Sequence, residues 1–241
     1  MKIALIGYGK MGKIIEQLAA QQGHEIVLRV TSANRDSITP ETLRTSDVAI
    51  EFSRPDAAPA NIELCLNAGV PVVVGTTAWG QHLDRVRQQC AQTAGALFYA
   101  SNFSIGVNIF FAINRQLAKL MATQPNYMAS MEEIHHTQKL DAPSGTAVSL
   151  ANDILAENSA ITRWVNSSDY RLGDPALPIT AIRADNVTGT HIVRYQSDID
   201  SIEIKHEAFN RQGFAQGAIL AAAWLIGKKG VYTMQDMLNL G

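Results

Sequence analysis

The sequence has little cysteine and no excess of either charge. Its 241 residues contain two cysteines, Cys65 and Cys90, which are too few for a disulfide framework. Both fall at apolar positions of helix-like stretches, so we expect buried thiols in a reducing compartment. The 20 Lys and Arg residues nearly balance the 22 Asp and Glu residues, giving a net charge of -2. This balance argues against a nucleic-acid-binding protein with a broad basic surface and against a polybasic membrane anchor.

Long apolar runs are also missing. The longest, at 218–226, is far shorter than the roughly 18 residues that a membrane-spanning helix needs. The apolar start at 1–7 is too short for a signal-peptide core and is interrupted at Gly7. We therefore expect a cytoplasmic protein. A small anion can still bind at a local basic site, since net charge does not describe one site.

The first part of the chain alternates strand-like and helix-like segments. With 46% apolar and 17% charged residues, the chain can bury a substantial core. Strands are expected at 2–6, 25–30, 47–52, 70–74 and 97–100, with helices after the first strand, over 57–67 and around 83–90. Strands separated by helices of about a dozen residues predict an α/β, doubly wound parallel sheet.

Beyond about residue 104 the pattern changes. Helices are expected at 109–121 and 149–155, an extended segment at 128–136, and strands at 190–196 and 201–207 joined by a hairpin. This predicts an α+β domain with an open mixed sheet. A final apolar helix at 217–226 is expected to pack between layers or on the first domain. We therefore expect residues 1–104 and 215–241 to form one domain, and residues 105–214 a second domain.

A glycine-rich turn follows the first strand and precedes a helix. Its residues are Gly7, Tyr8, Gly9, Lys10, Met11 and Gly12. In the pattern Gly-x-Gly-x-x-Gly, the first glycine permits a tight turn, the second lets backbone approach a pyrophosphate, and the third allows close helix–strand packing. Free N–H groups at the helix start then bind the phosphates. The turn predicts a Rossmann-type domain that binds NADPH or NADH. A glycine-rich turn of another α/β fold is the alternative.

The segment after the second strand bears on the choice of cofactor. An acidic residue here would bind the ribose hydroxyl of NAD, but the sequence runs through Ser32 and Asn34 to Arg35 without one. Ser32 and Asn34 can bind a ribose or a phosphate, and Arg35 and Lys10 can face a 2′-phosphate. We expect NADPH to be accepted, alone or together with NADH. The alternative is that Arg35 and Lys10 are solvated surface charges.

The segment 133–147 contains the residues best suited to chemistry. His135 and His136 are adjacent, and neighbours in a strand point to opposite sides, so the two should have different roles. Glu133 lies on the same side as His135 and can orient its ring, and Lys139 follows within reach. Adjacent histidines on opposite faces cannot easily share a metal, and no Cys or His lies at ligand spacing. We therefore expect no metal.

A hydroxyl-rich helix start follows these histidines. Ser144, Gly145 and Thr146 lead into the helix, where a hydroxyl, free N–H groups and the positive end of the helix dipole together can hold a carboxylate or phosphate. Lys139 adds a full positive charge. The segment predicts a small anionic substrate beside a proton donor. A plain helix N-cap with surface histidines is the alternative.

The sequence resembles the 4-hydroxy-tetrahydrodipicolinate reductase (dihydrodipicolinate reductase) family. The whole segment 133–147, Glu-x-His-His-x-x-Lys-x-Asp-Ala-Pro-Ser-Gly-Thr-Ala, is similar to that family's signature. Further matches extend along nearly the whole chain: the glycine turn, 50–55, 75–77, 101–108, 182–183, 189–191 and 214–218. The resemblance implies hydride transfer from NAD(P)H to a cyclic dicarboxylate with loss of water, in the diaminopimelate route to lysine. It also implies that residues 1–104 and 215–241 form a dinucleotide-binding domain and residues 105–214 a substrate-binding and oligomerisation domain, with a homotetramer assembled through the sheet of the second.

The resemblance also implies residue roles. His135 matches the proposed proton donor or acceptor and Lys139 the proton donor. An acid with a pKa near neutrality suits protonation of the enamine-like carbon left by hydride addition, but which of the two residues donates stays open. The other matches are His136, Ser144, Gly145 and Thr146 for the substrate carboxylates, and Gly75, Thr76, Thr77, Ala100, Ser101, Asn102 and Phe103 for the loops at the nicotinamide end.

The chain departs from the family pattern at a few positions. Lys10 stands where arginine is usual, and Ala78 and Ala184 stand where glycine is commoner. The missing acid after the second strand leaves the preference for NADH or NADPH open. Two other functions remain as alternatives: a different two-domain NAD(P)-dependent dehydrogenase of a small carboxylate, and a non-catalytic NADPH-binding sensor.

Overall fold

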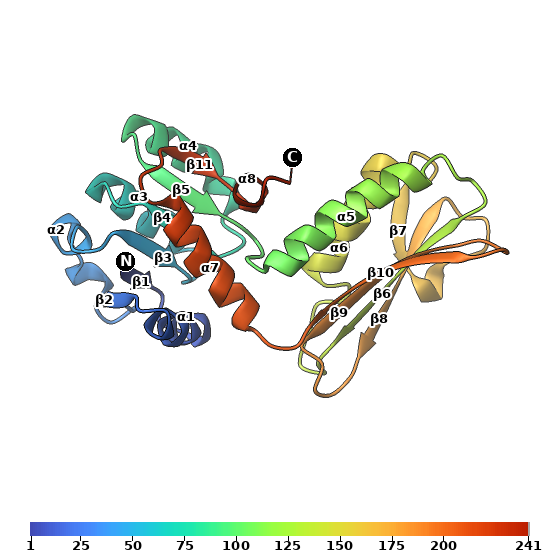
Figure 1. Cartoon of the computed structure of the whole chain (residues 1–241), viewed down its shortest axis with the longest axis horizontal. Helices are drawn as coiled ribbons and strands as arrows, with labels where there is room; N and C mark the ends of the chain where they lie inside the picture. Colours follow the sequence, from blue (N-terminus) through green and yellow to red (C-terminus); the bar gives the residue numbers. More distant parts are fainter. Residues whose placement is uncertain (241) are drawn as a thin grey trace. The chain divides into compact units, whose positions relative to one another are not determined.

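The structure is a computed structural model that describes residues 1–240. The chain forms two compact units (Figure 1). The first comprises Met1–Ile105 together with the segment from Gln212 onward, and the second comprises Gly106–Arg211. Among the described residues no helix is long and apolar enough to cross a membrane. Cys65 and Cys90 are buried and free, as predicted.

The first unit is built on a six-stranded sheet whose pairings are all parallel. The strand order is β11-β5-β4-β3-β1-β2. The strands are β1 (Lys2–Ile6), β2 (Glu25–Val30), β3 (Val48–Glu51), β4 (Val72–Val74), β5 (Ala96–Tyr99) and β11 (Gly230–Tyr232). The central strands are short and buried, and they are apolar except for Glu51 at the end of β3, as expected when both faces of a parallel sheet are covered.

Helices cover both faces of this sheet, which confirms the doubly wound prediction. The helices are α1 (Lys10–Gln21), α2 (Pro40–Leu43), α3 (Ala58–Ala68), α4 (Leu83–Gln92), α7 (Gln212–Leu225) and α8 (Met234–Leu238). Ile3 and Leu5 of β1 belong to the core that includes α1 and α7. Ala4 and Ile6 point the other way, into the core that includes α3 and α4, because successive strand residues face opposite sides.

The apolar helix α7 packs on the sheet of the first unit, against α1, β3 and β4. Its approach to the chain after β5 is very close. A Cβ atom on Gly217 would lie 1.8 Å from the carbonyl oxygen of Phe103, so this contact requires glycine. The nearly all-apolar composition of α7 is explained by its packing in this core, where Ala218, Ala221 and Ala222 are fully buried.

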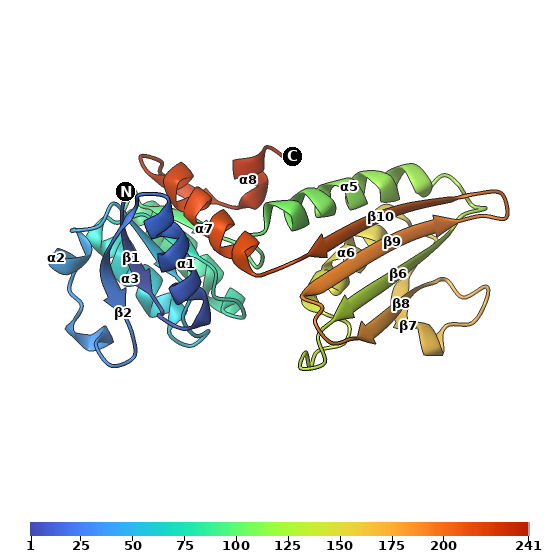
Figure 2. The same ribbon diagram turned by 60° about the horizontal axis from the view of Figure 1, so that its bottom comes forward.

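The second unit is a five-stranded mixed sheet with α5 and α6 on one face (Figure 2). The strand order is β10-β9-β6-β8-β7, and the central β6 is antiparallel to β9 and parallel to β8. The elements are α5 (Ile105–Met121), β6 (Met128–His135), α6 (Gly145–Glu157), β7 (Arg163–Asn166), β8 (Ala176–Arg183), β9 (Gly189–Gln196) and β10 (Ser201–Ala208). This confirms the predicted open mixed sheet.

Some elements were not predicted from the sequence. Strand β8 has an irregular burial pattern and contains Pro178, so it shows neither clean alternation nor the composition of a central strand. Strands β7 and β11 are only 4 and 3 residues long. Helix α6 starts earlier than expected, at Gly145, because the hydroxyl of Ser144 caps it by accepting from the N–H of Ala147.

Candidate active site

The glycine turn after β1 has the geometry that its sequence predicts. Gly7 has φ +94°, and a Cβ atom there would lie 2.1 Å from the carbonyl oxygen of Phe52. A Cβ atom on Gly12 would lie 2.4 Å from the carbonyl oxygen of Gly7, so the start of α1 packs closely on the turn. Gly9, by contrast, faces open space. The middle glycine therefore leaves room for a ligand, while the other two allow the close backbone packing.

A pocket of about 550 Å³ lies beside this turn. Of the residues predicted to bind the cofactor, Gly7, Tyr8, Gly9, Ser32 and Arg35 line it, and Lys10, Met11 and Gly12 do not. The remaining lining residues are Ile6, Val30, Thr31, Asp36, Phe52, Ser53, Arg54, Asp56, Ala57 and Asn61.

Two polar side chains beside this pocket are used within the chain. Asn34 accepts from the N–H of Thr31 at 2.7 Å and donates to the carbonyl of Arg29 at 2.9 Å. Its amide thus holds the turn after β2, and it does not line the pocket. The hydroxyl of Tyr8 donates to the carboxylate of Glu16. Ser32 and Arg35 are therefore the predicted side chains at this end of the pocket that remain for a ribose or phosphate.

A second cavity in the first unit, of about 230 Å³, includes Thr76, Thr77, Ala100 and Ser101 among its lining residues. Other predicted residues of these loops hold the backbone in place. A Cβ atom on Gly75 would lie 2.0 Å from the Phe52 ring. The side chain of Asn102 accepts from the N–H of Ser104 at 2.9 Å, and Phe103 is buried in the core.

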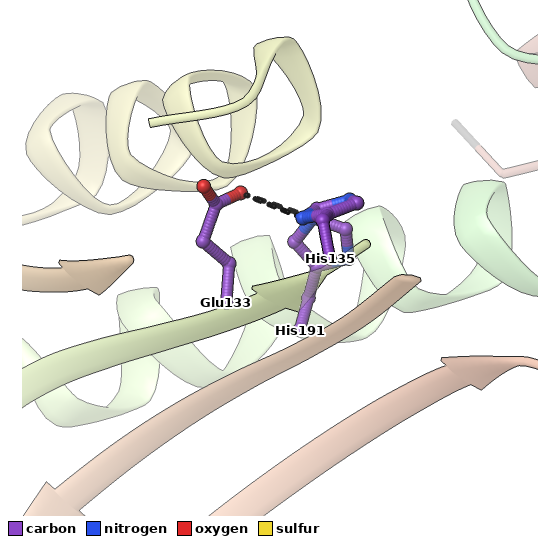
Figure 3. A group of neighbouring side chains, drawn as sticks. All are labelled: Glu133, His135 and His191. Atoms are coloured by element: carbon purple, nitrogen blue, oxygen red, sulfur yellow. Dashed lines mark ion pairs between the residues drawn. The ribbon is translucent and has the colours of Figure 1, made fainter. Parts of the chain in front are cut away.

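In the second unit, the register of the sheet brings four polar residues together. Across the antiparallel pair, Glu133 of β6 lies opposite His191 of β9. Across the parallel pair, His135 of β6 lies opposite Arg183 of β8. Glu133 and His135 are two residues apart, so both face the same side of the sheet, where α6 begins. Figure 3 shows the carboxylate of Glu133 facing the two imidazole rings.

Glu133 is fully buried and is the centre of this cluster. Its two carboxylate oxygens accept from the N–H of Ser144 at 3.0 and 3.1 Å. The guanidinium of Arg183 lies 3.3 Å from Oε1, and the imidazoles of His135 and His191 lie 3.5 and 3.7 Å from Oε2. One carboxylate thus joins the helix start, two strands and both rings, and the cation beside it compensates the cost of its burial.

Both buried histidines of the cluster favour the neutral form. Burial lowers the pKa of His135, and the nearby carboxylate of Glu133 opposes this by raising it. Burial lowers the pKa of His191 to about 3. The rings are stacked edge to face with centroids 5.0 Å apart. Gly189 leaves space beside Nε2 of His135, since a Cβ atom there would come within 3.1 Å of it.

The positive charge of Lys139 is already paired within the chain. Its ammonium contacts both carboxylate oxygens of Asp141, at 2.8 and 2.9 Å. This bond lowers the pKa of Asp141, and the backbone of Gly145 contributes to the same shift. The sequence predicted that Lys139 adds a full positive charge beside the helix start and did not predict a partner for it. The structure instead places the Asp141 carboxylate between Lys139 and the first turn of α6.

The predicted carboxylate cradle is only partly accessible. Ser144 is 2% exposed, and its hydroxyl lies 3.2 Å from Nε2 of His191 in addition to capping α6. Gly145 is exposed and Thr146 is half-buried. Ser144 therefore holds the helix start in place, and the accessible part of the cradle is formed by the two residues after it.

His136 lies apart from His135, as the alternation of side chains predicts. It lines a cavity of about 630 Å³ in the second unit, together with Thr137, Gln138, Asp185 and Arg211 among others. The hydroxyl of Thr137 donates to Asp185 at 3.0 Å. The two adjacent histidines thus face different surroundings, one a buried charged cluster and the other an open cavity.

His191 and Arg183 are members of the cluster to which sequence reasoning gave no role. The only signal for them was their place in the matches at 182–183 and 189–191. Within residues 1–240, ligand atoms of Glu133, His135 and His191 lie within 4.8 Å of one another, close enough to hold a metal ion. The Arg183 guanidinium already supplies a positive charge to the same carboxylate, and this charge disfavours a metal cation beside it. Nδ1 of each ring has no hydrogen-bond partner among the described residues.

Comparisons with known proteins cover the whole chain. The family model described as "Dihydrodipicolinate reductase, N-terminus" matches residues 1–103, and the one described as "Dihydrodipicolinate reductase, C-terminus" matches residues 106–238. A 4-hydroxy-tetrahydrodipicolinate reductase of Christiangramia forsetii is 46% identical over 99% of this chain and 98% of its own length. One of Methanosarcina barkeri is 35% identical over 97% of this chain and 83% of its own length.

A solved structure also has a similar fold. It is a dihydrodipicolinate reductase from Paenisporosarcina sp. TG-14 with dipicolinate bound. The TM-score is 0.78 at 21% identity, and the match covers 98% of this chain and 99% of that one.

Proposed function

The chain belongs to the dihydrodipicolinate reductase family and is an NAD(P)-dependent oxidoreductase, and we propose that it reduces 4-hydroxy-tetrahydrodipicolinate to tetrahydrodipicolinate with loss of water, in the diaminopimelate route to lysine. The observation that carries this proposal is the 46% identity to a curated reductase over 99% of the chain. The buried Glu133–His135–His191–Arg183 cluster supports it, because it places a histidine beside a fixed carboxylate.

The first unit is proposed to bind the cofactor. NADPH or NADH would supply the hydride, and the protein would supply position and charge. The open space at Gly9 and the pocket beside it fit a pyrophosphate. Ser32 and Arg35 are proposed for the ribose end, and the loops at Gly75, Thr76 and Thr77 and at 100–103 for the nicotinamide end. The glycine turn contributes the positive end of α1.

The second unit is proposed to bind the substrate and to handle the proton. His135 is proposed as the proton donor or acceptor. Its Nδ1 faces Glu133, so Nε2, beside the space at Gly189, is the atom left to exchange a proton. Lys139 is the alternative donor, and it would first have to separate from Asp141. His136, Gly145 and Thr146 are proposed to bind the substrate carboxylates, with Ser144 supporting the helix start.

Oxidation of NADPH tests the function. Substrate would be generated by the preceding synthase, and the loss of NADPH absorbance would be followed with and without the purified protein. We expect a loss that requires both the synthase product and this protein. NADPH binding without any oxidation would instead indicate the non-catalytic sensor. Oxidation with other small carboxylates but not with this product would indicate a different dehydrogenase.

We also propose a cytoplasmic homotetramer. The two buried free cysteines suit a reducing compartment. The sheet face of the second unit opposite α5 and α6 carries exposed apolar side chains, including Met128 and Ile182, and can bury them against a second copy. Light scattering should give four times the chain mass of 26.2 kDa, and Ile182→Asp should lower it. A monomeric wild-type protein would contradict this assembly.

A further inference from the structure

The guanidinium of Arg35, the proposed contact for a 2′-phosphate, forms a hydrogen bond with the side chain of Asn61. Its Nε donates to Oδ1 of Asn61 at 2.5 Å. Arg35 begins the short turn η1 (Arg35–Ser37) after β2, whereas Asn61 lies in α3. Among the described residues, neither terminal nitrogen of this guanidinium has a hydrogen-bond or ion-pair partner. The bond at Nε therefore orients the side chain and leaves its fork free.

Asn61 in turn can present only its oxygen to Arg35. It is 3% exposed, and its Nδ2 donates to Oε1 of Glu51 at 3.3 Å and to the hydroxyl of Ser53 at 3.2 Å. A side-chain amide has one acceptor end and one donor end. Because Glu51 and Ser53 accept from the amide nitrogen of Asn61, its Oδ1 faces Arg35.

Glu51, which fixes this orientation, takes no part in the proposed chemistry. It ends β3, is fully buried, and accepts from the N–H of Ser53 at 3.2 Å and from the Ser53 hydroxyl. Burial raises the pKa of Glu51. A buried polar group is retained where its hydrogen bonds hold something in place, and here these bonds lead through Asn61 to the pocket.

Among the described residues that line this pocket, Arg35 is also the cation without an ion-pair partner. Arg54, the other cation in the lining, donates to both carboxylate oxygens of Asp56 at 3.0 and 2.5 Å. Asp36 also lines the pocket and works against an anion. An oriented guanidinium with a free fork can form two parallel bonds to a phosphate, which a mobile side chain forms less readily.

We propose that Asn61 is a positioning residue for cofactor selectivity. It holds the guanidinium of Arg35 toward the 2′-phosphate of NADPH, and Glu51 holds the amide of Asn61 in the required orientation. This inference rests on the proposed function, specifically on the contact between Arg35 and the 2′-phosphate. NADH lacks this phosphate, so the effect of Asn61 should appear with NADPH alone.

The test measures the dissociation constants of NADPH and NADH by fluorescence titration, without substrate. We expect Asn61→Ala to raise the dissociation constant of NADPH by about tenfold, the order expected for a lost bond to a charged group, and to leave that of NADH within about twofold. Asn61→Ser should do the same, because its hydroxyl lies one atom short of the position of Oδ1 and cannot reach Arg35.

Two further variants isolate the role of Asn61. Asn67→Ala is the matched control, since Asn67 lies on the same helix but bonds Gln89 at 2.8 Å, and it should change neither constant. Combined with Arg35→Ala, Asn61→Ala should add no further loss of NADPH affinity, because it acts through Arg35.

The outcomes separate this inference from the proposal on which it rests. If Arg35→Ala weakens NADPH selectively while Asn61→Ala and Asn61→Ser change both cofactors equally or neither, the positioning role is wrong and the phosphate contact stands. If Arg35→Ala itself affects both cofactors equally, the phosphate contact and the positioning role both fail. Neither result bears on the reduction itself, which the NADPH oxidation assay tests.

Discussion

Arg183 contacts the buried carboxylate of Glu133 through both terminal nitrogens, at 3.4 and 3.3 Å from Oε1. The same guanidinium donates to the carbonyl oxygens of Lys139 at 3.2 Å and Asp141 at 2.6 Å. One side chain of β8 therefore connects the carboxylate beside His135 to the segment that carries Lys139. Arg183 thus helps to position both candidate proton donors, His135 through Glu133 and Lys139 through its own carbonyl group.

Replacing this support should impair turnover without affecting the cofactor. We expect Arg183→Lys to lower kcat by about tenfold or more, because an ammonium lacks the planar fork that bonds a carboxylate and two carbonyls together. The dissociation constant of NADPH should be unchanged, since Arg183 lies outside the unit with the glycine turn. Arg163→Lys, at an exposed position of the edge strand β7, is the control. A wild-type kcat for Arg183→Lys would mean that the Glu133 cluster does not support catalysis.

His135 should affect chemistry far more than binding. Loss of a general acid or base typically lowers the rate by about 10²- to 10⁴-fold, so we expect His135→Gln to lower kcat on that order while NADPH binds within about twofold of wild type. Steady-state kinetics and fluorescence titration measure the two effects. Comparison with Lys139→Met then identifies the donor, because the variant with the larger loss of kcat lacks it. A parallel loss of cofactor affinity in His135→Gln would show that its assigned role is wrong.

The buried His191 should make the protein less stable in mild acid. Burial lowers its pKa from 6.5 to about 3. At a pH between these two values, the imidazole is protonated in the unfolded chain and neutral in the folded chain. Stability therefore decreases as the pH falls below about 6.5, and this group alone accounts for about 2 kcal/mol between pH 8 and pH 5. Urea unfolding at the two pH values should show a smaller decrease for His191→Gln than for the wild type. His82→Gln, in the other unit, should behave like the wild type, and an unchanged decrease in His191→Gln would contradict the assignment.

The glycine turn predicts two different effects of adding one methyl group. Gly12→Ala would place Cβ 2.4 Å from the carbonyl oxygen of Gly7, so we expect a lower melting temperature and weaker binding of both cofactors. Apart from its chain neighbours, no atom of residues 1–240 lies within 4 Å of a Cβ atom on Gly9, and Gly9 has φ -86°, so Gly9→Ala should leave the fold unaffected while displacing the cofactor. Thermal unfolding and fluorescence titration would separate the two effects. Normal cofactor affinity in Gly9→Ala would argue against close approach of a pyrophosphate at this turn.

Local patterns predicted most of the first unit, although they missed its short edge strand β11. The alternation of short apolar strands with helices predicted the doubly wound sheet, and the apolar composition of 217–226 predicted a helix buried in a core. Such signals are local, because the periodicity of a strand or helix is set by its own burial. Strand β8 was missed because its burial pattern is irregular and it contains Pro178, so it lacks the alternation that indicates a strand. Its Arg183 is nevertheless central to the candidate site.

Within the site, the sequence predicted residue types better than contacts. The strand alternation correctly separated His135 from His136 and put Glu133 on the side of His135. It did not predict the pairing of Lys139 with Asp141, the burial of Ser144, or the contact of Glu133 with His191. Asn61 carried no recognisable motif, and Glu51 was marked only by its place in the match at 50–55, since each matters through the one side chain that it orients.

The sequence by itself determined the secondary-structure pattern, the glycine turn, the family signature and therefore the class of reaction, because these depend on residues close together in the chain. Only the tertiary structure decided which charges are free and which are paired. Sheet register set His191 opposite Glu133 and Arg183 opposite His135, and the packing of α3 brought Asn61 to Arg35. Hydrogen bonds and ion pairs depend on separations of a few ångströms between residues distant in sequence, and no local pattern encodes those separations.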